Sequence, residues 1–239
     1  MDNYKECIEY YQSLKRKEVK KKKYLSKFAL KEHHRLQNID FLKKSFEDIN
    51  EAFDYKNDVY TWMLAVEIMD ISLSKIWFSK FAKNKCNFLC ACISIAQKFN
   101  DVFQYTLTEI ANEFGECNIE AVKAFEIKIL FEGLSCNVRL VTMYEVYEIV
   151  IQILRFKIAE IDSIDELCQE LIEMTYHKYH YLRIPNTLKV ISIVIFAYQI
   201  IHKVTNLNLF FDCTFYSETG YSQKEIFSCI KKIKKDVNS

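Results

Sequence analysis

Glycine and proline are scarce in this sequence, with three glycines and one proline among 239 residues. These residues form the turns and bulges of β-sandwiches, barrels and doubly wound sheets, so their scarcity argues against those folds. Half of the residues are apolar, which is enough to fill a core. The composition therefore predicts an all-helical (all-α) protein with one large domain or two small ones.

A large charge of one sign is also missing, because the formal net charge is +1. No global electrostatic attraction draws such a chain to nucleic acid or to an anionic membrane. Residues 1–11 are charged and polar, and so lack the apolar centre of a signal peptide. The longest apolar run, Ile184 to Ile201, contains Pro185 and Lys189 and is too polar to span a bilayer comfortably. We expect no direct nucleic-acid partner and no membrane partner.

The sequence offers little that could form a catalytic or metal site. Its nine cysteines are scattered, and segments such as Cys90 to Ile93 place them in apolar helical patterns, so we expect reduced, packed thiols of an intracellular protein. His177 and His180 have no second ligand pair nearby, which argues against a zinc site. Three glycines could hardly build a phosphate-binding loop or a nucleophile elbow. We expect no metal, no cofactor and no catalytic activity.

Apolar periodicity predicts helices over residues 59–74, 85–99 and 107–114, with Gly115 ending the last of these and Asn118 opening a further helix. The helix over residues 85–99 is apolar or small on nearly every side. A helix without a polar face belongs at the centre of a bundle.

The second half of the chain repeats this plan. Residues 188–201 are again apolar almost all round, and Ser222 with Glu225 forms a capping box that opens another helix. Three apolar positions of that helix lie 104 residues after three apolar positions of the helix opened by Asn118: Ile226, Cys229 and Ile233 follow Val122, Phe125 and Ile129. The repeat predicts a duplicated helical bundle.

Several segments resemble the cyclin family. Residues 64–74, LAVEIMDISLS, resemble the cyclin-box helix "LAVNYIDRFLS", and residues 92–100, CISIAQKFN, are similar to "LLASKFEE". Residues 125–130, FEIKIL, are similar to "MEMKIL", and residues 218–229 resemble the "TGYT…C" stretch of cell-cycle cyclins. The resemblance implies tandem cyclin-box folds of five helices each after an N-terminal helix. The expected parts are a basic segment over residues 1–36, an N-terminal cyclin box over 37–140 and a C-terminal cyclin fold over 141–239.

The resemblance also implies a kinase-binding site at Lys98 and Glu126. In cyclins, a lysine and a glutamate at these motif positions contact the kinase backbone beside its C-helix, and Phe99 and Leu130 match apolar kinase-contacting positions. The alternative is that the two charges face solvent on unrelated helices and that the two apolar residues belong to the core. Asp70 matches a family aspartate with a structural role within the bundle. The counterparts of the charged pair 104 residues later are His202 and Ile230, so we expect the pair only in the first bundle.

These matches predict a non-catalytic regulatory subunit that binds and activates a cyclin-dependent serine/threonine kinase, in cell-cycle control. The alternatives are a transcriptional cyclin and a transcription-factor-IIB-like adaptor, although the adaptor should have basic helical repeats and a zinc ribbon. We expect the protein in nucleus and cytoplasm. The basic residues at Lys15 to Lys17 and at Lys20 to Lys23 could form an import signal or a solvated helix.

Two departures from the family pattern qualify the site. The "MRAIL" segment of the first cyclin helix has its nearest register at Ile39 to Lys43, so we expect no substrate-docking patch of the usual form. After Leu130 the family has a leucine three residues on, whereas this chain has Gly133 there and Leu134 one residue later. This predicts a single inserted residue in the turn.

Overall fold

The computed structural model describes residues 2–25, 32–52, 59–75, 84–101, 104–115, 117–204 and 214–238. These residues form α-helices, one π-helix and two 3₁₀-helices, with no strand among them, so the predicted all-helical class is confirmed. No helix in these ranges is both long enough and apolar enough to cross a membrane. The chain forms two compact units, an N-terminal unit of residues 23–142 and a C-terminal unit of residues 1–22 with 143–239.

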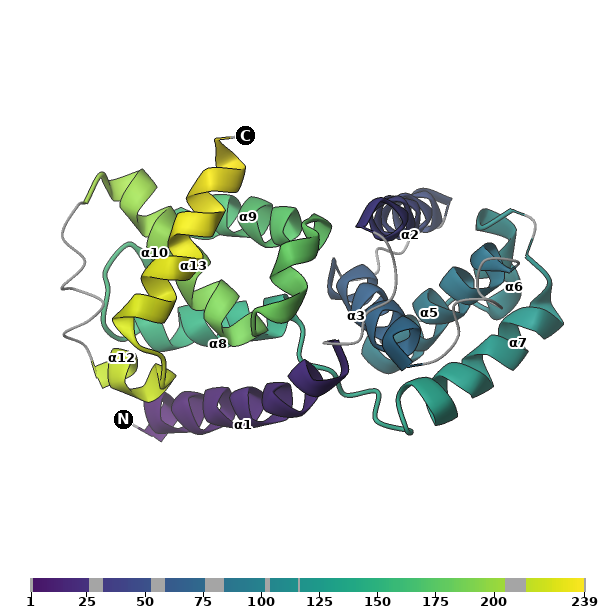
Figure 1. Ribbon diagram of the computed structural model, residues 1–239, viewed down its shortest axis with the longest axis horizontal. Coiled ribbons are helices and arrows are strands. Elements are labelled where there is room, and N and C mark those ends of the chain that lie inside the picture. The colour runs from purple at the N-terminus through teal and green to yellow at the C-terminus, as the bar shows by residue number, and fades with distance from the viewer. Residues whose placement is uncertain are drawn as a thin grey trace. The chain divides into compact units, whose positions relative to one another are not determined.

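The N-terminal unit is built around a central helix, α5 (Lys85–Asn100). Figure 1 shows α5 among its neighbours, and it contacts α2, α3, α6 and α7. Every residue from Asn87 to Gln97 is buried, which confirms the central position predicted from its apolar surface. The surrounding elements are α2 (Glu32–Ala52), α3 (Val59–Lys75), α6 (Leu107–Glu113), α7 (Ile119–Lys128) and the π-helix η1 (Ile129–Gly133).

Capping residues set the ends of α6 and α7. Thr106 and Glu109 form a capping box at the start of α6. Gly115 follows the end of α6 with φ of +78°, a conformation that suits glycine, so the predicted stop is confirmed. The side chain of Asn118 accepts a hydrogen bond from the Ala121 backbone N–H at 2.9 Å, which confirms it as the N-cap of α7.

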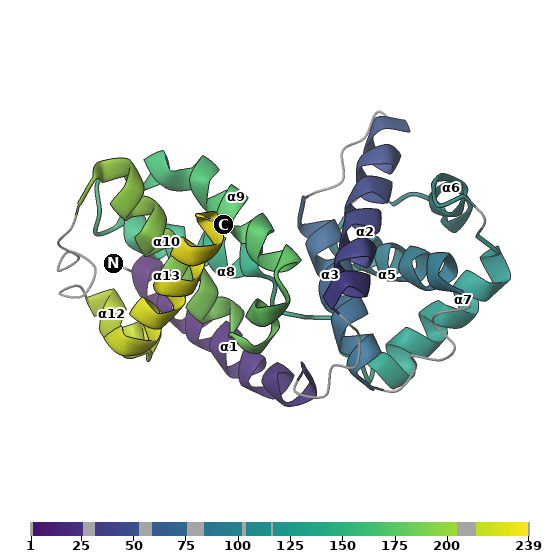
Figure 2. The same ribbon diagram turned by 45° about the horizontal axis from the view of Figure 1, so that its top comes forward.

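The C-terminal unit has the same plan around α10 (Asn186–His202). Residues 186–198 are all buried, and α10 contacts α8, α9 and α13. Helix α13 lies against α10 in both views (Figures 1 and 2). The other elements of this unit are α1 (Asp2–Leu25), α8 (Met143–Arg155), η2 (Ile161–Ile164), α9 (Asp165–His177), η3 (Tyr179–Arg183), α12 (Thr214–Thr219) and α13 (Gln223–Val237).

Helix α1 is joined to the C-terminal unit by buried polar contacts. The Glu18 carboxylate accepts hydrogen bonds from the backbone N–H groups of Asn186 at 2.5 Å and Thr187 at 3.0 Å. These groups lie at the start of α10, where N–H groups have no partner within the helix, and Pro185 supplies no side-chain cap. Glu18 therefore acts as the missing cap. The sequence placed residues 1–36 in a separate basic segment, whereas residues 1–22 pack with residues 143–239.

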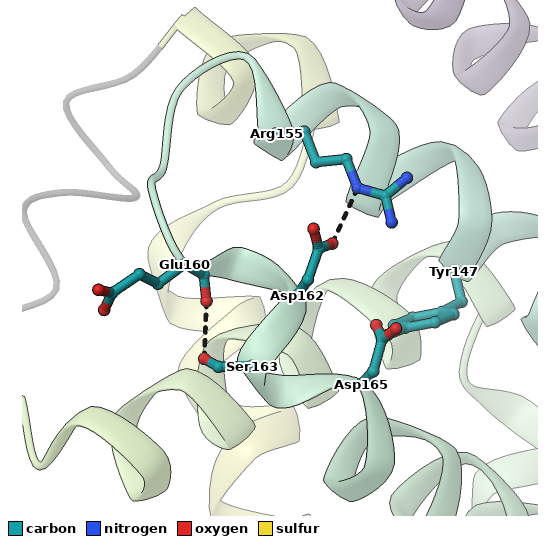
Figure 3. Close-up of polar contacts among 6 residues, drawn as sticks. All are labelled: Tyr147, Arg155, Glu160, Asp162, Ser163 and Asp165. Atoms are coloured by element: carbon teal, nitrogen blue, oxygen red, sulfur yellow. Dashed lines mark hydrogen bonds and ion pairs between the residues drawn. The ribbon is translucent and has the colours of Figure 1, made fainter.

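The connection from α8 to α9 is fixed by short-range polar contacts (Figure 3). Glu160 has φ of 60°, in the left-handed region, and its carbonyl accepts a hydrogen bond from Ser163 Oγ at 2.6 Å. Arg155 Nε donates to Asp162 Oδ1 at 2.8 Å, and the Tyr147 hydroxyl donates to Asp165. These contacts hold η2 against α8, and η2 also contacts α10.

The predicted repeat is visible when α7 of the N-terminal unit is compared with α13 of the C-terminal unit. Their N-caps, Asn118 and Ser222, lie 104 residues apart, and Ser222 forms the predicted capping box with Glu225. Val122 and its counterpart Ile226 are both completely buried. The two helices therefore begin at equivalent points and bury the same side.

Candidate functional site

Lys98 lies near the end of α5, where the residues of this helix change from buried to exposed. Residues 87–97 are buried, whereas Lys98, Phe99 and Asn100 are exposed. The backbone N–H of Asp101 donates to the Gln97 carbonyl at 2.9 Å and ends the helix there. The central helix therefore presents Lys98 and Phe99 at the surface from a rigid, fully packed base.

The structure brings Lys98 and Glu126 together. Lys98 Nζ lies 2.6 Å from Glu126 Oε1, although the two residues are 28 positions apart and lie on different helices, α5 and α7. The exposed fraction of the side chain is 48 % for Lys98 and 13 % for Glu126. The two charges are therefore in contact, although Lys98 also faces solvent. Their role in kinase binding stays a prediction.

This ion pair can still bind a partner. An ammonium has three N–H donors and a carboxylate has two acceptor oxygens, so one mutual hydrogen bond leaves capacity on both groups. Because each charge is balanced by the other, a partner could cover the pair without leaving a lone buried charge. Such a pair suits recognition of main-chain N–H and C=O groups.

Exposed apolar residues neighbour both charged residues in the sequence. Phe99, which follows Lys98, is 51 % exposed, and Ile127, which follows Glu126, is 60 % exposed. Leu130 is only partly exposed, whereas Phe131, the next residue, is 66 % exposed. Sequence analysis missed Ile127 and Phe131. The periodicity of α7 could have identified Ile127, because it lies off the inner stripe of Val122 and Ile129.

The end of α7 forms the π-helix η1. The Leu134 N–H donates to the Ile129 carbonyl at 2.7 Å, a bond that spans one residue more than an α-helical bond. The inserted residue after Leu130 relative to the family pattern stays a prediction. A Cβ atom at Gly133 would lie 2.6 Å from Ser72 Oγ of α3, so the turn reaches this contact because residue 133 has no side chain.

Asp70 lies in the core and not at the site surface. Its carboxylate accepts two hydrogen bonds from Arg35, at 2.9 Å from Nε and 2.8 Å from Nη2, and both side chains are almost completely buried. The pair ties α2 to α3, which agrees with the structural role predicted for Asp70. Sequence analysis missed Arg35. The "MRAIL" motif has an arginine at its second position, and this signal would have set the register at His34 instead of Ile39.

The candidate metal ligands considered in the sequence are used elsewhere. His177 Nδ1 lies 2.9 Å from the Glu173 carbonyl, and His180 Nε2 lies 2.9 Å from Asp236 Oδ2. Cys90 and Cys92 are buried in α5, and burial raises the pKa of the Cys92 thiol. Within the described residues, no group of three or more histidine, cysteine, aspartate and glutamate side chains could hold a metal ion.

The C-terminal unit lacks the charged pair, as the repeat predicted. His202, the counterpart of Lys98, lies 2.9 Å through Nε2 from Ser163 Oγ and stacks on Tyr198. Ile230, the counterpart of Glu126, is buried. At the repeat positions of Lys98 and Glu126, the C-terminal unit thus has a histidine and a buried isoleucine in place of the ion pair.

Comparison of the sequence with models of known protein families identifies the family of this chain. Residues 6–139 match the family model described as cyclin, N-terminal domain, which covers more than half of the chain. The chain therefore belongs to the cyclin family, whose members are generally non-catalytic regulatory subunits that bind a kinase. A search of curated proteins gave no match. The family match begins within α1 and ends four residues before α8 begins.

Proposed function

We propose that this cyclin binds and activates a cyclin-dependent serine/threonine kinase through the α5–α7 end of its N-terminal unit. The observation that carries the proposal is the 2.6 Å contact between Lys98 Nζ and Glu126 Oε1, with exposed Phe99 and Ile127 beside it. The cyclin supplies no catalytic group, and its contribution is to hold the kinase in an active conformation.

Activation follows from the position of the kinase C-helix. A protein kinase is active when a lysine of its sheet pairs with a glutamate of that helix. Lys98 would donate to main-chain carbonyls beside the C-helix, and Glu126 would accept from main-chain N–H groups. Phe99, Ile127 and Leu130 would pack around these bonds and exclude water, which strengthens them. The helix would then be held inward, with its glutamate in place.

We further propose that the residues 143–202 and 214–238 of the C-terminal unit form a second cyclin fold. Support comes from the matched N-caps of α7 and α13 and from the two central helices. Because His202 and Ile230 replace the charged pair, this second fold would not hold the C-helix in the same way.

Reconstitution with candidate kinases tests the site. Lys98→Ala and Glu126→Ala should each weaken kinase binding by about 2–5 kcal/mol, because the partner charge is left unpaired in the interface. Two control variants should bind as the wild type does. Lys123→Ala removes an exposed lysine of the same helix α7, which pairs with Glu120 at 2.9 Å, and His202→Ala removes the repeat counterpart of Lys98. Unchanged affinity of both site variants, measured by calorimetry, would show that the site is wrong.

The choice of kinase separates two roles. We propose a cell-cycle kinase, on the resemblance of residues 218–229 to cell-cycle cyclins. The assay therefore compares phosphorylation of a histone-type substrate by cell-cycle kinases with phosphorylation of a polymerase-tail peptide by transcriptional kinases. Stimulation of the second group alone would instead assign a transcriptional cyclin.

The proposed location is the nucleus and the cytoplasm. Lys15 of the basic tract is held in the fold, because its Nζ donates to the Thr219 carbonyl at 2.5 Å and lies 4.0 Å from the centre of the Tyr221 ring. The side chains of Lys20 to Lys23 lie outside the described residues. A fluorescent fusion with these four lysines changed to alanine should lose nuclear signal if they form the import signal. Retained nuclear signal would exclude them.

A further inference from the structure

An open groove lies between α10 and α13 of the C-terminal unit, two helices that lie side by side in Figures 1 and 2. Three apolar residues that line it reach solvent: Ile200 is 44 % exposed, Phe227 45 % and Val237 48 %. Phe196 and Ile230 also line the groove and are buried. Core residues thus form the base of the groove, and exposed apolar side chains form its sides.

Two lysines of α13 give this apolar groove a positive charge. Lys231 and Lys234 both line it and are exposed. Among the residues that the structure describes, no carboxylate lines the groove and neither ammonium group has an ion-pair partner. The acidic residues of α13 are engaged elsewhere, because Glu225 belongs to the capping box and Asp236 lies 2.9 Å from His180 Nε2. The chain itself therefore leaves this charge uncompensated.

The repeat shows that the charge is a local change and not a feature of the shared helical plan. Lys231 and Lys234 lie 104 residues after Ile127 and Leu130. The C-terminal unit thus has lysines where the N-terminal unit has apolar residues. A partner of the groove has to bring negative charge to these two positions.

The combination of apolar surface and cationic rim limits what can fill the groove. Exposed apolar surface with a polar rim is typical of protein-docking sites. A purely apolar partner would cover the two ammonium groups without compensating their charge, which is unfavourable. A partner that also carries carboxylates compensates both charges while it buries Ile200 and Phe227. The groove follows α13 from Phe227 to Val237, a length of about 15 Å, which matches about three turns of a facing helix.

We propose that the groove between α10 and α13 binds an acidic amphipathic helix of a partner protein. Apolar side chains at the i, i+3, i+4 and i+7 positions of that helix would pack on Ile200 and Phe227. Aspartate or glutamate residues beside this apolar face would bond to Lys231 and Lys234, which are three residues apart and therefore adjacent on α13. The groove lies wholly within the C-terminal unit, so the inference does not depend on kinase binding through the N-terminal unit.

A synthetic peptide tests the chemistry of the partner. The probe is a stapled, fluorescein-labelled helix of about twelve residues, with leucine at the four apolar positions, glutamate beside them and alanine elsewhere. Fluorescence anisotropy with the full chain should show saturable binding that weakens as salt is added, because salt screens the charges. A control peptide with lysine in place of each glutamate should bind at least about tenfold more weakly. Equal affinity of the two peptides would overturn the proposal.

Charge-reversal variants locate the acidic contacts. Lys231→Glu combined with Lys234→Glu should weaken binding of the glutamate peptide at least about tenfold. Lys224→Glu combined with Lys232→Glu is the matched control, because these two exposed lysines lie on the same helix but do not line the groove. The control changes the net charge equally and should alter the affinity by less than about twofold. Equal losses in the two double variants would show that the peptide responds only to overall charge.

A pair of neighbouring isoleucines locates the apolar contacts. Ile200→Ala should weaken binding at least about fivefold, because it removes apolar contact area. Ile201→Ala should leave the affinity unchanged, because Ile201 is 45 % exposed but does not line the groove. Circular dichroism checks that each variant is folded. Equal effects of the two substitutions would place the peptide elsewhere.

Other occupants would give different results, each of which overturns the proposal. If the peptide does not bind and the chain forms a dimer in sedimentation that Ile200→Ala abolishes, a second copy fills the groove. If only vesicles of equal parts phosphatidylserine and phosphatidylcholine bind, the groove contacts a membrane surface. Nuclear magnetic resonance of the isotope-labelled wild-type chain decides the question even where a variant does not fold. The bound peptide should shift the amide signals of Ile200, Phe227 and Lys231, and shifts confined to the N-terminal unit would exclude the groove.

Discussion

The central helices α5 and α10 are buried alike, yet the helix pairs that they form end in different chemistry. Helix α5 ends at Lys98, which bonds to Glu126 of α7. At the equivalent end of α10, His202 lies 2.9 Å from Ser163, and the counterpart of Glu126 on α13 is the buried Ile230. The duplicated core is retained while the exposed ends differ. This comparison teaches that the helical plan alone does not place a lysine–glutamate pair at the surface.

The α10–α13 surface also differs in character. An open groove there is lined by Phe196, Ile200, Phe227, Lys231 and Lys234 among others. Apolar side chains and ammonium groups line it, without a carboxylate among the lining residues that the structure describes. A surface of this composition cannot offer both a donor and an acceptor charge to a kinase backbone, in contrast to Lys98 with Glu126.

The largest expected effect is on the free energy of unfolding. Breaking a buried ion pair of the N-terminal unit should lower it far more than breaking an exposed ion pair of the C-terminal unit. Asp70→Asn should lower the free energy of unfolding by about 3–5 kcal/mol, because Arg35 is left as a buried, uncompensated charge. Asp162→Asn should cost at most about 1 kcal/mol, because its pair with Arg155 is solvent-exposed on both sides.

Urea unfolding measures both changes. The two tryptophans, Trp62 and Trp77, lie within residues 23–142, so tryptophan fluorescence follows the N-terminal unit, while circular dichroism follows the whole chain. Equal costs at the two pairs would contradict the difference in burial on which this prediction depends.

The next effect concerns the attachment of α1 in the C-terminal unit. Glu18→Gln should lower the free energy of unfolding of that unit by about 1.5–3 kcal/mol, the range for hydrogen bonds to a charged group. Amide hydrogen exchange should rise at Asn186 and Thr187, whose N–H groups lose the carboxylate. Glu9→Gln is the matched control, because Glu9 lies on the same helix in an exposed pair with Lys5. Unaltered exchange at the start of α10 would exclude the capping role.

These attachments show which parts of the fold could be predicted from sequence. The central helices and the caps at Asn118 and Ser222 were predictable, because apolar surface and capping residues are local properties of the chain. The place of α1 was not, because Glu18 meets Asn186 across 168 residues and nothing local signals that contact. The basic residues suggested a separate segment, although Lys15 lies against Thr219 and Tyr221.

The residues of the candidate site also fall into those that the sequence predicted and those that it did not. Family motifs identified Lys98 and Glu126, and the structure brings them into contact. Periodicity and composition alone would have left them as surface charges. Arg35 was missed because its partner Asp70 lies 35 residues away along the chain. Phe131 was missed because its exposure depends on the π-helix η1, whose extra residue rotates the positions after Leu130 away from α-helical periodicity.

A smaller difference in stability is expected between a substitution in η1, which follows α7, and the equivalent substitution at the end of α13. Gly133→Ala should lower the stability of the N-terminal unit by about 1–3 kcal/mol, because the new methyl group meets Ser72. Its repeat counterpart is Val237, which is exposed at the end of the regular helix α13, so Val237→Ala should change stability by less than about 0.5 kcal/mol. Ser72→Ala should recover part of the loss, as measured by a double-mutant cycle. Additive costs would show that the two residues are not in contact.

The smallest expected effect is the pH dependence of a tyrosine that holds α1, α10 and α13 together. Burial raises the pKa of Tyr221 to about 12, even though the hydrogen bond with Thr187 acts in the opposite direction. An unfolded tyrosine titrates near pH 10. Its contribution to stability is therefore fully present below about pH 10 and is lost as the pH rises toward 12, because the unfolded chain releases the proton first.

The difference in stability between the wild type and Tyr221→Phe measures the effect of ionising the Tyr221 hydroxyl. Lys15, Glu18 and Glu225 lie near this side chain in both proteins, and in the wild type the two carboxylates add to burial in raising the pKa of the Tyr221 hydroxyl. The difference in stability between wild type and variant should shrink steadily between about pH 10 and pH 12 when urea unfolding is followed by circular dichroism under reducing conditions. A constant difference across this range would mean that Tyr221 titrates alike in the folded and unfolded chains, so that the junction of α1 with α10 and α13 does not shield its hydroxyl from water.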